Sequence, residues 1–170
     1  MLILGVDPGS RHTGYALIET GGGSMRLIDD GRVSLPPRMS LPQRLAGLIR
    51  EMGSILERWQ PQAAAVESPY HGPNVKSLIV LAQARGAILA LMGGHDIEIH
   101  EYSPAEVMIA VAGNGRADKA QVSRMVHLLL SLDPSDRSDD QTDAMAVAVC
   151  YAKCYRMERV RHQHGVGKAL

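Results

Sequence analysis

The hydrophobic and polar positions of this chain follow two patterns, short apolar runs and longer stretches with helical spacing. Three apolar runs open the chain, at residues 2–6, 13–19 and 25–35. Runs of this length with turns between them are typical of consecutive antiparallel strands. The first run is almost entirely apolar, which is typical of a strand that is covered on both faces.

Beyond residue 40, helical stretches alternate with strand-like runs. Apolar residues at spacings of three and four predict an amphipathic helix over residues 41–59. Two short apolar runs, at residues 63–66 and 97–102, predict two further strands. Capping or terminating residues bound four more predicted helices, over residues 75–92, 104–112, 118–132 and 138–155.

This order of elements predicts an α/β fold with one five-stranded mixed sheet. The first three strands would form an antiparallel meander, the strand–helix alternation would add parallel strands, and helices would cover both faces. A length of 170 residues suits one domain with a substantial core. We expect this domain to span residues 1–156, followed by a poorly ordered, basic C-terminal tail over residues 157–170.

The composition is that of a soluble globular protein, with 21% charged residues. Because no apolar run reaches the roughly 20 residues of a membrane span and the N-terminus lacks a secretory pattern, we expect no membrane association and a cytoplasmic location. Cys150 and Cys154 are the only cysteines, and we expect them to be packed in a helix rather than to bind metal. The formal net charge is zero, so charge alone does not predict nucleic-acid binding.

Two predicted strands end in a carboxylate. Asp7 follows the first strand and is held by a Pro-Gly turn, and Glu67 follows the strand at residues 63–66. A lone buried charge is costly unless another group, such as a metal ion, offsets it. If the two strands lie side by side, both carboxylates lie at one edge of the sheet, where folds of this kind place their sites.

The last predicted helix carries Asp139, Asp140 and Asp143 in its first turns. Either of the first two shares a helix face with Asp143, so spacing alone does not choose between the two pairs. Helix capping would also explain these residues, because Ser138 and Gln141 have the form of a capping box and acidic side chains complement the helix dipole. A cluster of carboxylates without histidine or cysteine favours Mg²⁺ or Mn²⁺.

Five separated motifs of this chain resemble the RuvC family of bacterial Holliday-junction resolvases, in the RNase H-like superfamily. The motifs are GVDPGSRHTGY at 5–15, AVE at 65–67, LAQARG at 81–86, GNGRADKAQV at 113–122 and DQTDAMA at 140–146. The resemblance implies an RNase H-like fold and a homodimeric endonuclease that nicks two opposed strands of a four-way DNA junction in recombination and repair. It also implies that the acidic pair is Asp140 and Asp143, with Asp139 as a neighbour.

With this assignment, Asp7, Glu67, Asp140 and Asp143 are expected to be the catalytic residues and the ligands of two Mg²⁺ ions, for which Mn²⁺ would substitute. Two ions about 4 Å apart would activate a water molecule for in-line attack on phosphorus and stabilise the leaving 3′ oxygen. The products would carry 5′-phosphate and 3′-hydroxyl ends. Asp7 is our choice for the ligand that bridges both ions.

Six further residues are candidate DNA contacts. Tyr70 occupies the place of a family aromatic that stacks on a base, and Lys119, at a predicted helix start that favours phosphate, matches a family lysine at the scissile strand. Met108 stands where the family often has a second lysine, and nearby Arg116 is a candidate substitute. The remaining three candidates, of which the last has an equally good structural explanation, are Asn74, Lys76 and Arg85.

The resemblance also implies the branch-migration proteins RuvA and RuvB as partners. Two other classes of protein fit this sequence less well. An RNase H-like nucleic-acid-binding protein without catalysis would lack one of the four carboxylates, whereas this chain has all four. An ATPase domain of the actin and sugar-kinase type also begins with a strand and an Asp-x-Gly turn, but it needs two related lobes, for which 170 residues are too few.

Overall fold

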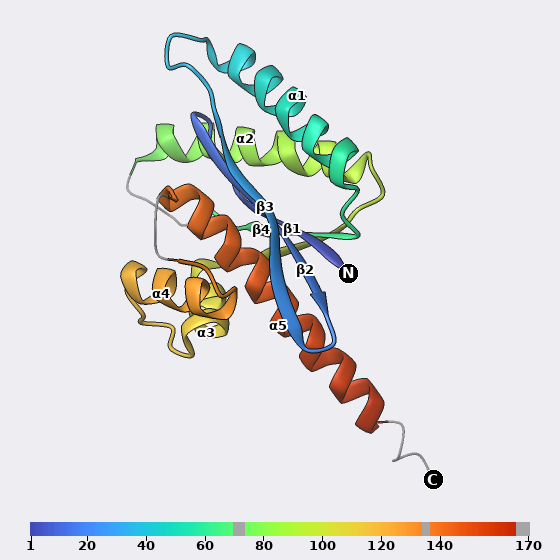
Figure 1. Cartoon of the computed structure of the whole chain (residues 1–170). Helices are drawn as coiled ribbons and strands as arrows, with labels where there is room; N and C mark the ends of the chain where they lie inside the picture. Colours follow the sequence, from blue (N-terminus) through green and yellow to red (C-terminus); the bar gives the residue numbers. More distant parts are fainter. Residues whose placement is uncertain (70–73, 134–136, 166–170) are drawn as a thin grey trace.

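The computed structural model describes the backbone of residues 1–69, 74–133 and 137–165, and the side chains of these segments as far as residue 157. Within these segments the strands form one five-stranded sheet in the order β3-β2-β1-β4-β5 (Figure 1). The strands are β1 (Leu2–Asp7), β2 (His12–Gly21), β3 (Ser24–Ser34), β4 (Ala63–Glu67) and β5 (Glu98–Tyr102). The first three pair antiparallel, whereas β4 and β5 run parallel to β1, so the predicted mixed sheet is confirmed.

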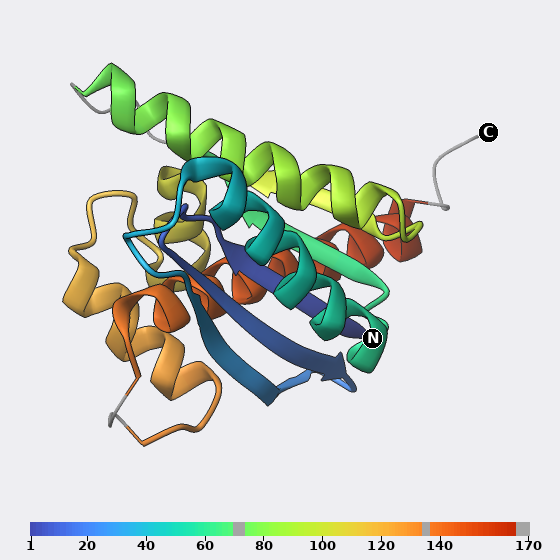
Figure 2. The same ribbon diagram turned by 90° about the horizontal axis from the view of Figure 1, so that it is seen from above.

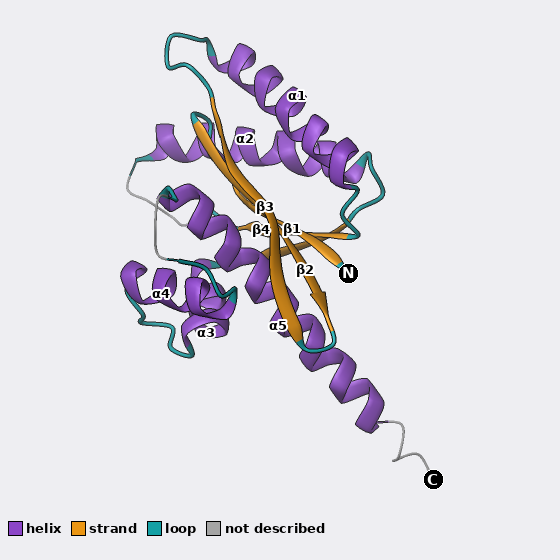
Figure 3. Cartoon of the chain, in the orientation of Figure 1, coloured by secondary structure: helices purple, strands orange, loops and turns teal. Residues whose placement is uncertain are grey.

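Helices cover both faces of this sheet, as predicted. One face packs against α1 (Leu41–Trp59) and α2 (Val75–Gly93), which Figure 2 shows lying over the same side of the sheet. The other face packs against α5 (Asp139–Gly165), and the short helices α3 (Pro104–Ala112) and α4 (Lys119–Leu129) contact α5 (Figure 3). The sheet is therefore the middle layer of three.

The central strand β1 is buried on both faces because its side chains alternate between the two helical layers. Ile3 lies in the core beside α5, whereas Leu4 and Val6 lie in the core beside α1 and α2. Gly5 lets α5 approach the sheet closely, since a Cβ atom at this position would lie 2.1 Å from the backbone oxygen of Ala144. The strand that carries Asp7 is thus held firmly from both sides.

Three elements have an end that differs from the predicted one by two residues or more. Helix α4 ends at Leu129 rather than near residue 132, because Ser131 adopts a left-handed conformation with φ of 54° that ends the helix. Strand β2 is longer than its apolar run and reaches Gly21. Helix α5 continues to Gly165, beyond the predicted helix end at residue 155.

Of the described helices, α2 is the one that is long and apolar enough to cross a membrane, judged by length and composition alone. It packs on the sheet through Ala84, Ile88 and Met92. Its remaining apolar residues include Val75 and Ile79, which are 65% and 53% exposed. The helix therefore has one buried side and one side on which apolar residues are exposed.

Candidate active site

The sheet brings Asp7 and Glu67 to the same edge. Strands β1 and β4 are parallel neighbours, and their register pairs Val6 with Val66. Asp7 and Glu67 follow these residues directly, and both line one cleft of about 120 Å³. The predicted convergence of two carboxylates at one sheet edge is what the structure shows.

The first turn of α5 delivers the remaining acidic residues. Ser138 and Gln141 form the predicted capping box: the Ser138 backbone N–H donates to Gln141 Oε1 at 3.0 Å, and the Gln141 N–H donates to Ser138 Oγ at 3.4 Å. These two residues cap the helix, so capping leaves the aspartate side chains free for another role. Asp139 is 83% exposed at its side chain, whereas Asp140 and Asp143 are about one-third exposed, at 30% and 31%.

The antiparallel register places three residues of neighbouring strands at one level beneath this turn. Asp7 on β1 is paired with Gly14 on β2, and Gly14 is paired with Arg32 on β3. Arg32 Nη1 lies 3.5 Å from Asp140 Oδ2. Asp140 is therefore turned toward β3 and lines a hollow next to the cleft of Asp7 and Glu67.

Burial and mutual repulsion dominate the electrostatics of these carboxylates. Burial, then the negative charges of Glu67, Asp143 and Asp140, raises the pKa of Asp7 from 3.8 to about 8. Burial, then the charge of Asp143, also raises the pKa of Glu67, and burial raises the pKa of Asp143 although Lys119 acts in the opposite direction. Glu67, Asp143 and Asp140 thus lie close enough to Asp7 to hinder its ionisation.

Lys119 lies among these carboxylates. It is the first residue of α4, and its Nζ atom lies 2.9 Å from Asp143 Oδ2 and 3.2 Å from Asp139 Oδ2. Burial alone would lower the pKa of Lys119, but these two aspartates outweigh burial and raise it. A second hollow of about 150 Å³ is lined by Glu67, Lys119 and Asp143, and the Met108 side chain lies on its apolar side.

A divalent metal ion fits this donor set by chemistry. Among the described residues, no three Asp, Glu, His or Cys side chains are placed so that together they could hold an ion. Asp143 is paired with Lys119, and Asp140 is paired with Arg32. The donors are carboxylate oxygens, which hard cations such as Mg²⁺ and Mn²⁺ prefer, and a divalent charge would offset both the burial and the repulsion that raise the pKa of Asp7.

The other predicted DNA contacts have different surroundings. Arg85 is 16% exposed at its side chain, forms an ion pair with Glu101 and donates from Nε to the backbone oxygen of Glu67 at 3.3 Å, so it supports the end of β4. The Asn74 side chain caps α2 by accepting from the Ser77 N–H at 3.2 Å. Lys76 and Arg116 are exposed, and Tyr70 lies outside the described residues.

Sequence reasoning missed the residues of β3 that face the acidic turn. Besides Arg32, they include Asp30, which accepts hydrogen bonds from Arg137 and Gln141. Asp29 and Asp30 precede a glycine, and in the sequence they are typical of surface residues near a turn. Nothing in the local pattern indicates that β3 lies beside the start of α5, more than 100 residues later in the chain.

The mixed sheet has this strand order, and acidic residues end its neighbouring strands β1 and β4. These features define an α/β protein of the RNase H-like class. Comparison with known sequences identifies the family within this class. The family described as crossover junction endodeoxyribonuclease RuvC matches residues 3–151. The chain belongs to this RuvC family.

Individual relatives support the same assignment. Crossover junction endodeoxyribonuclease RuvC of Halothermothrix orenii is 43% identical over 159 residues, which are 94% of this chain and 96% of the relative. The structure of Thermus thermophilus RuvC in complex with a Holliday junction substrate matches with a TM-score of 0.88 and 29% identity, covering 93% of this chain and 96% of that one. The yeast mitochondrial Holliday junction resolvase Ydc2 shares the fold, with a TM-score of 0.72 at 12% identity over 95% of this chain and 83% of that one.

Proposed function

We propose that this protein is a structure-selective endodeoxyribonuclease that resolves Holliday junctions by paired, symmetric nicks in homologous recombination and DNA repair. Its membership of the RuvC family and its likeness to Thermus thermophilus RuvC, which was solved with a Holliday junction substrate, support this function. The observation that carries the proposal is the acidic site itself. Asp7, Glu67 and Asp143 come from β1, β4 and α5 to one edge of the sheet, with Asp140 beside them.

We propose that Asp7, Glu67, Asp140 and Asp143 are the catalytic residues and hold two Mg²⁺ ions, for which Mn²⁺ would substitute. When bound, such ions lower the pKa of a water nucleophile and stabilise the leaving 3′ oxygen, which yields 5′-phosphate and 3′-hydroxyl ends. The protein would hold these ligands rigidly, because Asp7 and Glu67 lie at the ends of paired strands and Arg85 donates a hydrogen bond to the Glu67 backbone oxygen. An active rather than regulatory protein is favoured because all four carboxylates are present.

Lys119 would contribute positive charge next to the reacting phosphate. Its ammonium group is already within the acidic site, 2.9 Å from Asp143. It also belongs to the first turn of α4, where backbone N–H groups and the helix dipole favour an anion. Of the other predicted DNA contacts, Lys76 and Arg116 are exposed and free to meet the DNA backbone, and we retain Tyr70 as the proposed base-stacking residue.

Paired nicks need two sites, and we propose that a second copy of this chain supplies the other. Helix α2 is the candidate interface, since Val75 and Ile79 expose apolar side chains that a second α2 would cover. Family membership further supports RuvA and RuvB as partners and a cytoplasmic location.

The test is incubation of the purified protein with a synthetic four-way junction and with a linear duplex, with and without Mg²⁺. We expect symmetric nicks in the junction alone, only with Mg²⁺, and with ends that DNA ligase reseals. Junction binding without any nick in Mg²⁺ or Mn²⁺ would instead identify a DNA-binding protein without catalysis.

A further inference from the structure

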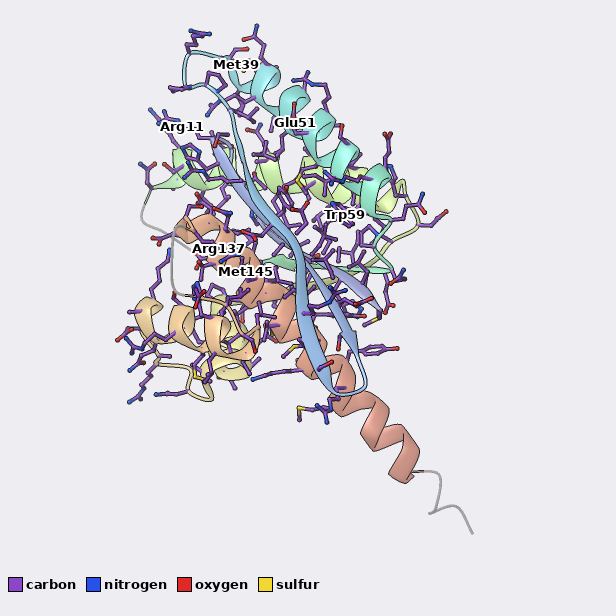
Figure 4. The ribbon with its side chains drawn as sticks, viewed as in Figure 1. Arg11, Met39, Glu51, Trp59, Arg137 and Met145 are labelled. Atoms are coloured by element: carbon purple, nitrogen blue, oxygen red, sulfur yellow. The ribbon has the colours of Figure 1, made fainter. Side chains whose placement is uncertain are left out.

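Asp30 on β3 carries a carboxylate that is not one of the proposed metal ligands. Its side chain is 12% exposed. Arg137 Nε donates to both of its oxygens, at 3.2 and 3.1 Å, and Gln141 Nε2 donates to Oδ2 at 2.7 Å. Figure 4 shows Arg137 at the N-terminal end of α5. Two donors from the start of α5 thus bind one largely buried acid on a strand at the edge of the sheet.

Gln141 connects Asp30 to the first turn of α5, which carries Asp140 and Asp143. Both ends of its side-chain amide are used, because Nε2 donates to Asp30 while Oε1 accepts from the Ser138 backbone N–H at 3.0 Å and from Ser138 Oγ at 2.9 Å. Gln141 lies between Asp140 and Asp143 in the chain, so an anchored Gln141 fixes the direction of the turn that carries both.

A second contact from the same strand supports the same turn. Arg32 lies two residues beyond Asp30, so the two side chains point to the same face of β3. Arg32 meets Asp140 at 3.5 Å. Asp29, in contrast, points to the opposite face, where its carboxylate accepts a hydrogen bond from Trp59 Nε1 of α1 at 3.0 Å.

A buried carboxylate is costly unless it is paired, and an unpaired one destabilises its surroundings strongly. The ion pair of Asp30 with Arg137 offsets this cost only while α5 begins in its observed place. Some groups do not bind the metal but orient its ligands. Removing such a group commonly lowers the metal affinity by about 10- to 100-fold. Asp30 has the position and the contacts of such a group.

We propose that Asp30 is a positioning residue. Through Arg137 and Gln141 it fixes the first turn of α5, so that Asp140 and Asp143 face Asp7 and Glu67, and it thereby sets the affinity of this acidic site for divalent cations. This inference rests on the proposed function of the site as a metal centre. It adds a role for a residue that is neither a proposed metal ligand nor a proposed DNA contact.

The test is Mg²⁺ binding to the intact, DNA-free protein, measured by titration calorimetry, together with the Mg²⁺ concentration that gives half-maximal nicking of a four-way junction. The variants are Asp30→Ala, Asp30→Asn and Arg137→Met. Asp29→Ala is the matched control, because it removes the neighbouring carboxylate from the same strand on its other face.

We expect Asp30→Ala and Arg137→Met to bind Mg²⁺ about tenfold more weakly, with nicking restored by higher Mg²⁺. Asp30→Asn, which keeps a hydrogen-bond acceptor for Gln141, should lose less affinity, and Asp29→Ala should keep the wild-type affinity. Arg137→Met leaves β3 unchanged, so it remains a test even if Asp30→Ala does not fold. Wild-type Mg²⁺ affinity in Arg137→Met would overturn the inference. An equal loss in Asp29→Ala would overturn it as well. Absence of Mg²⁺ binding by the wild-type protein would instead refute the proposed metal centre.

Discussion

Gly14 on β2 lies directly against the backbone carbonyl of Asp140 at the start of α5. A Cβ atom on residue 14 would lie 1.8 Å from that oxygen, a distance that no side chain can occupy. Gly14 is also paired with Asp7 on one side and with Arg32 on the other. The missing side chain therefore sets how closely the acidic turn approaches the strand end that carries Asp7.

The first prediction concerns this close approach. In Gly14→Ala, the methyl group displaces the first turn of α5 from β2, so we expect the free energy of unfolding to fall by about 1–3 kcal/mol. Nicking of a four-way junction should fall more than stability alone explains. Urea denaturation and initial nicking rates at a temperature where the variant is folded give the two values.

Gly53→Ala is the control for that substitution. Gly53 lies in α1 and a Cβ there meets nothing within 4 Å, so alanine should stabilise the helix by about 0.5–1 kcal/mol and leave nicking unchanged. A Gly14→Ala variant with wild-type stability and activity would show that the close approach is unimportant.

The second prediction concerns pH. Because burial and then its acidic neighbours raise the pKa of Asp7 to about 8 in the folded protein from 3.8, the folded state binds more protons than the unfolded state between these pH values. The free energy of unfolding of the metal-free protein should therefore fall as pH rises through this window, by up to about 1.4 kcal/mol per unit for this one group. Urea denaturation in EDTA at several pH values measures the slope.

Asp7→Asn removes the titrating group and should make that slope shallower, so that the variant is more stable than the wild type near pH 8 without metal. Asp96→Asn, an exposed position in the turn after α2, should retain the wild-type slope. An equal loss of stability with rising pH in Asp7→Asn and in the wild type would contradict the raised pKa of Asp7.

The third prediction concerns the exposed side of α2. Ile79→Asp places a charge on the apolar surface that we assign to the second copy, so the protein should become monomeric in analytical ultracentrifugation. Leu128→Asp, on α4, is the matched control, since Leu128 is also exposed, at 71% compared with 53% for Ile79. A monomeric wild-type protein, or a variant Ile79→Asp that stays dimeric, would contradict the assignment of this surface.

The fourth prediction concerns Lys119 as an internal cation of the acidic site. Lys119→Met removes a positive charge that lies 2.9 Å from Asp143, so Mg²⁺ should bind the DNA-free protein more tightly, by about 1 kcal/mol or about fivefold. Nicking should nevertheless slow, because the phosphate loses its positive partner. Arg124→Met, an exposed cation on the same helix, should change neither value, and weaker Mg²⁺ binding by Lys119→Met would be incompatible with this role.

Much of the fold could be predicted from the sequence because it follows local rules. The alternation of Ile3 and Leu4 between two cores makes β1 an apolar run, and the capping box of Ser138 and Gln141 marks the start of α5. Convergence of Asp7 and Glu67 at one edge follows from parallel pairing of the strands that precede them. Helical spacing was a poorer guide to the end of α5, which continues past the predicted residue 155 to Gly165.

The rest of the site depends on contacts between distant segments. Spacing could not choose between Asp139 and Asp140, whereas the structure shows the first exposed and the second turned toward β3. The support from Asp30 depends on the register of β3, which includes an irregularity opposite Leu17 and Ile18. No local pattern encodes a pairing between β3 and a helix more than 100 residues later.

The central claim is that the acidic site at the ends of β1 and β4 cleaves DNA with the help of divalent metal ions. It is tested most directly by comparing Asp7→Asn with the wild type on one synthetic four-way junction, measuring junction binding in EDTA and nicking in Mg²⁺. We predict that binding persists while nicking falls by more than about 100-fold, the upper range for groups that only support metal ligands. Nicking by Asp7→Asn at the wild-type rate in Mg²⁺ would contradict it.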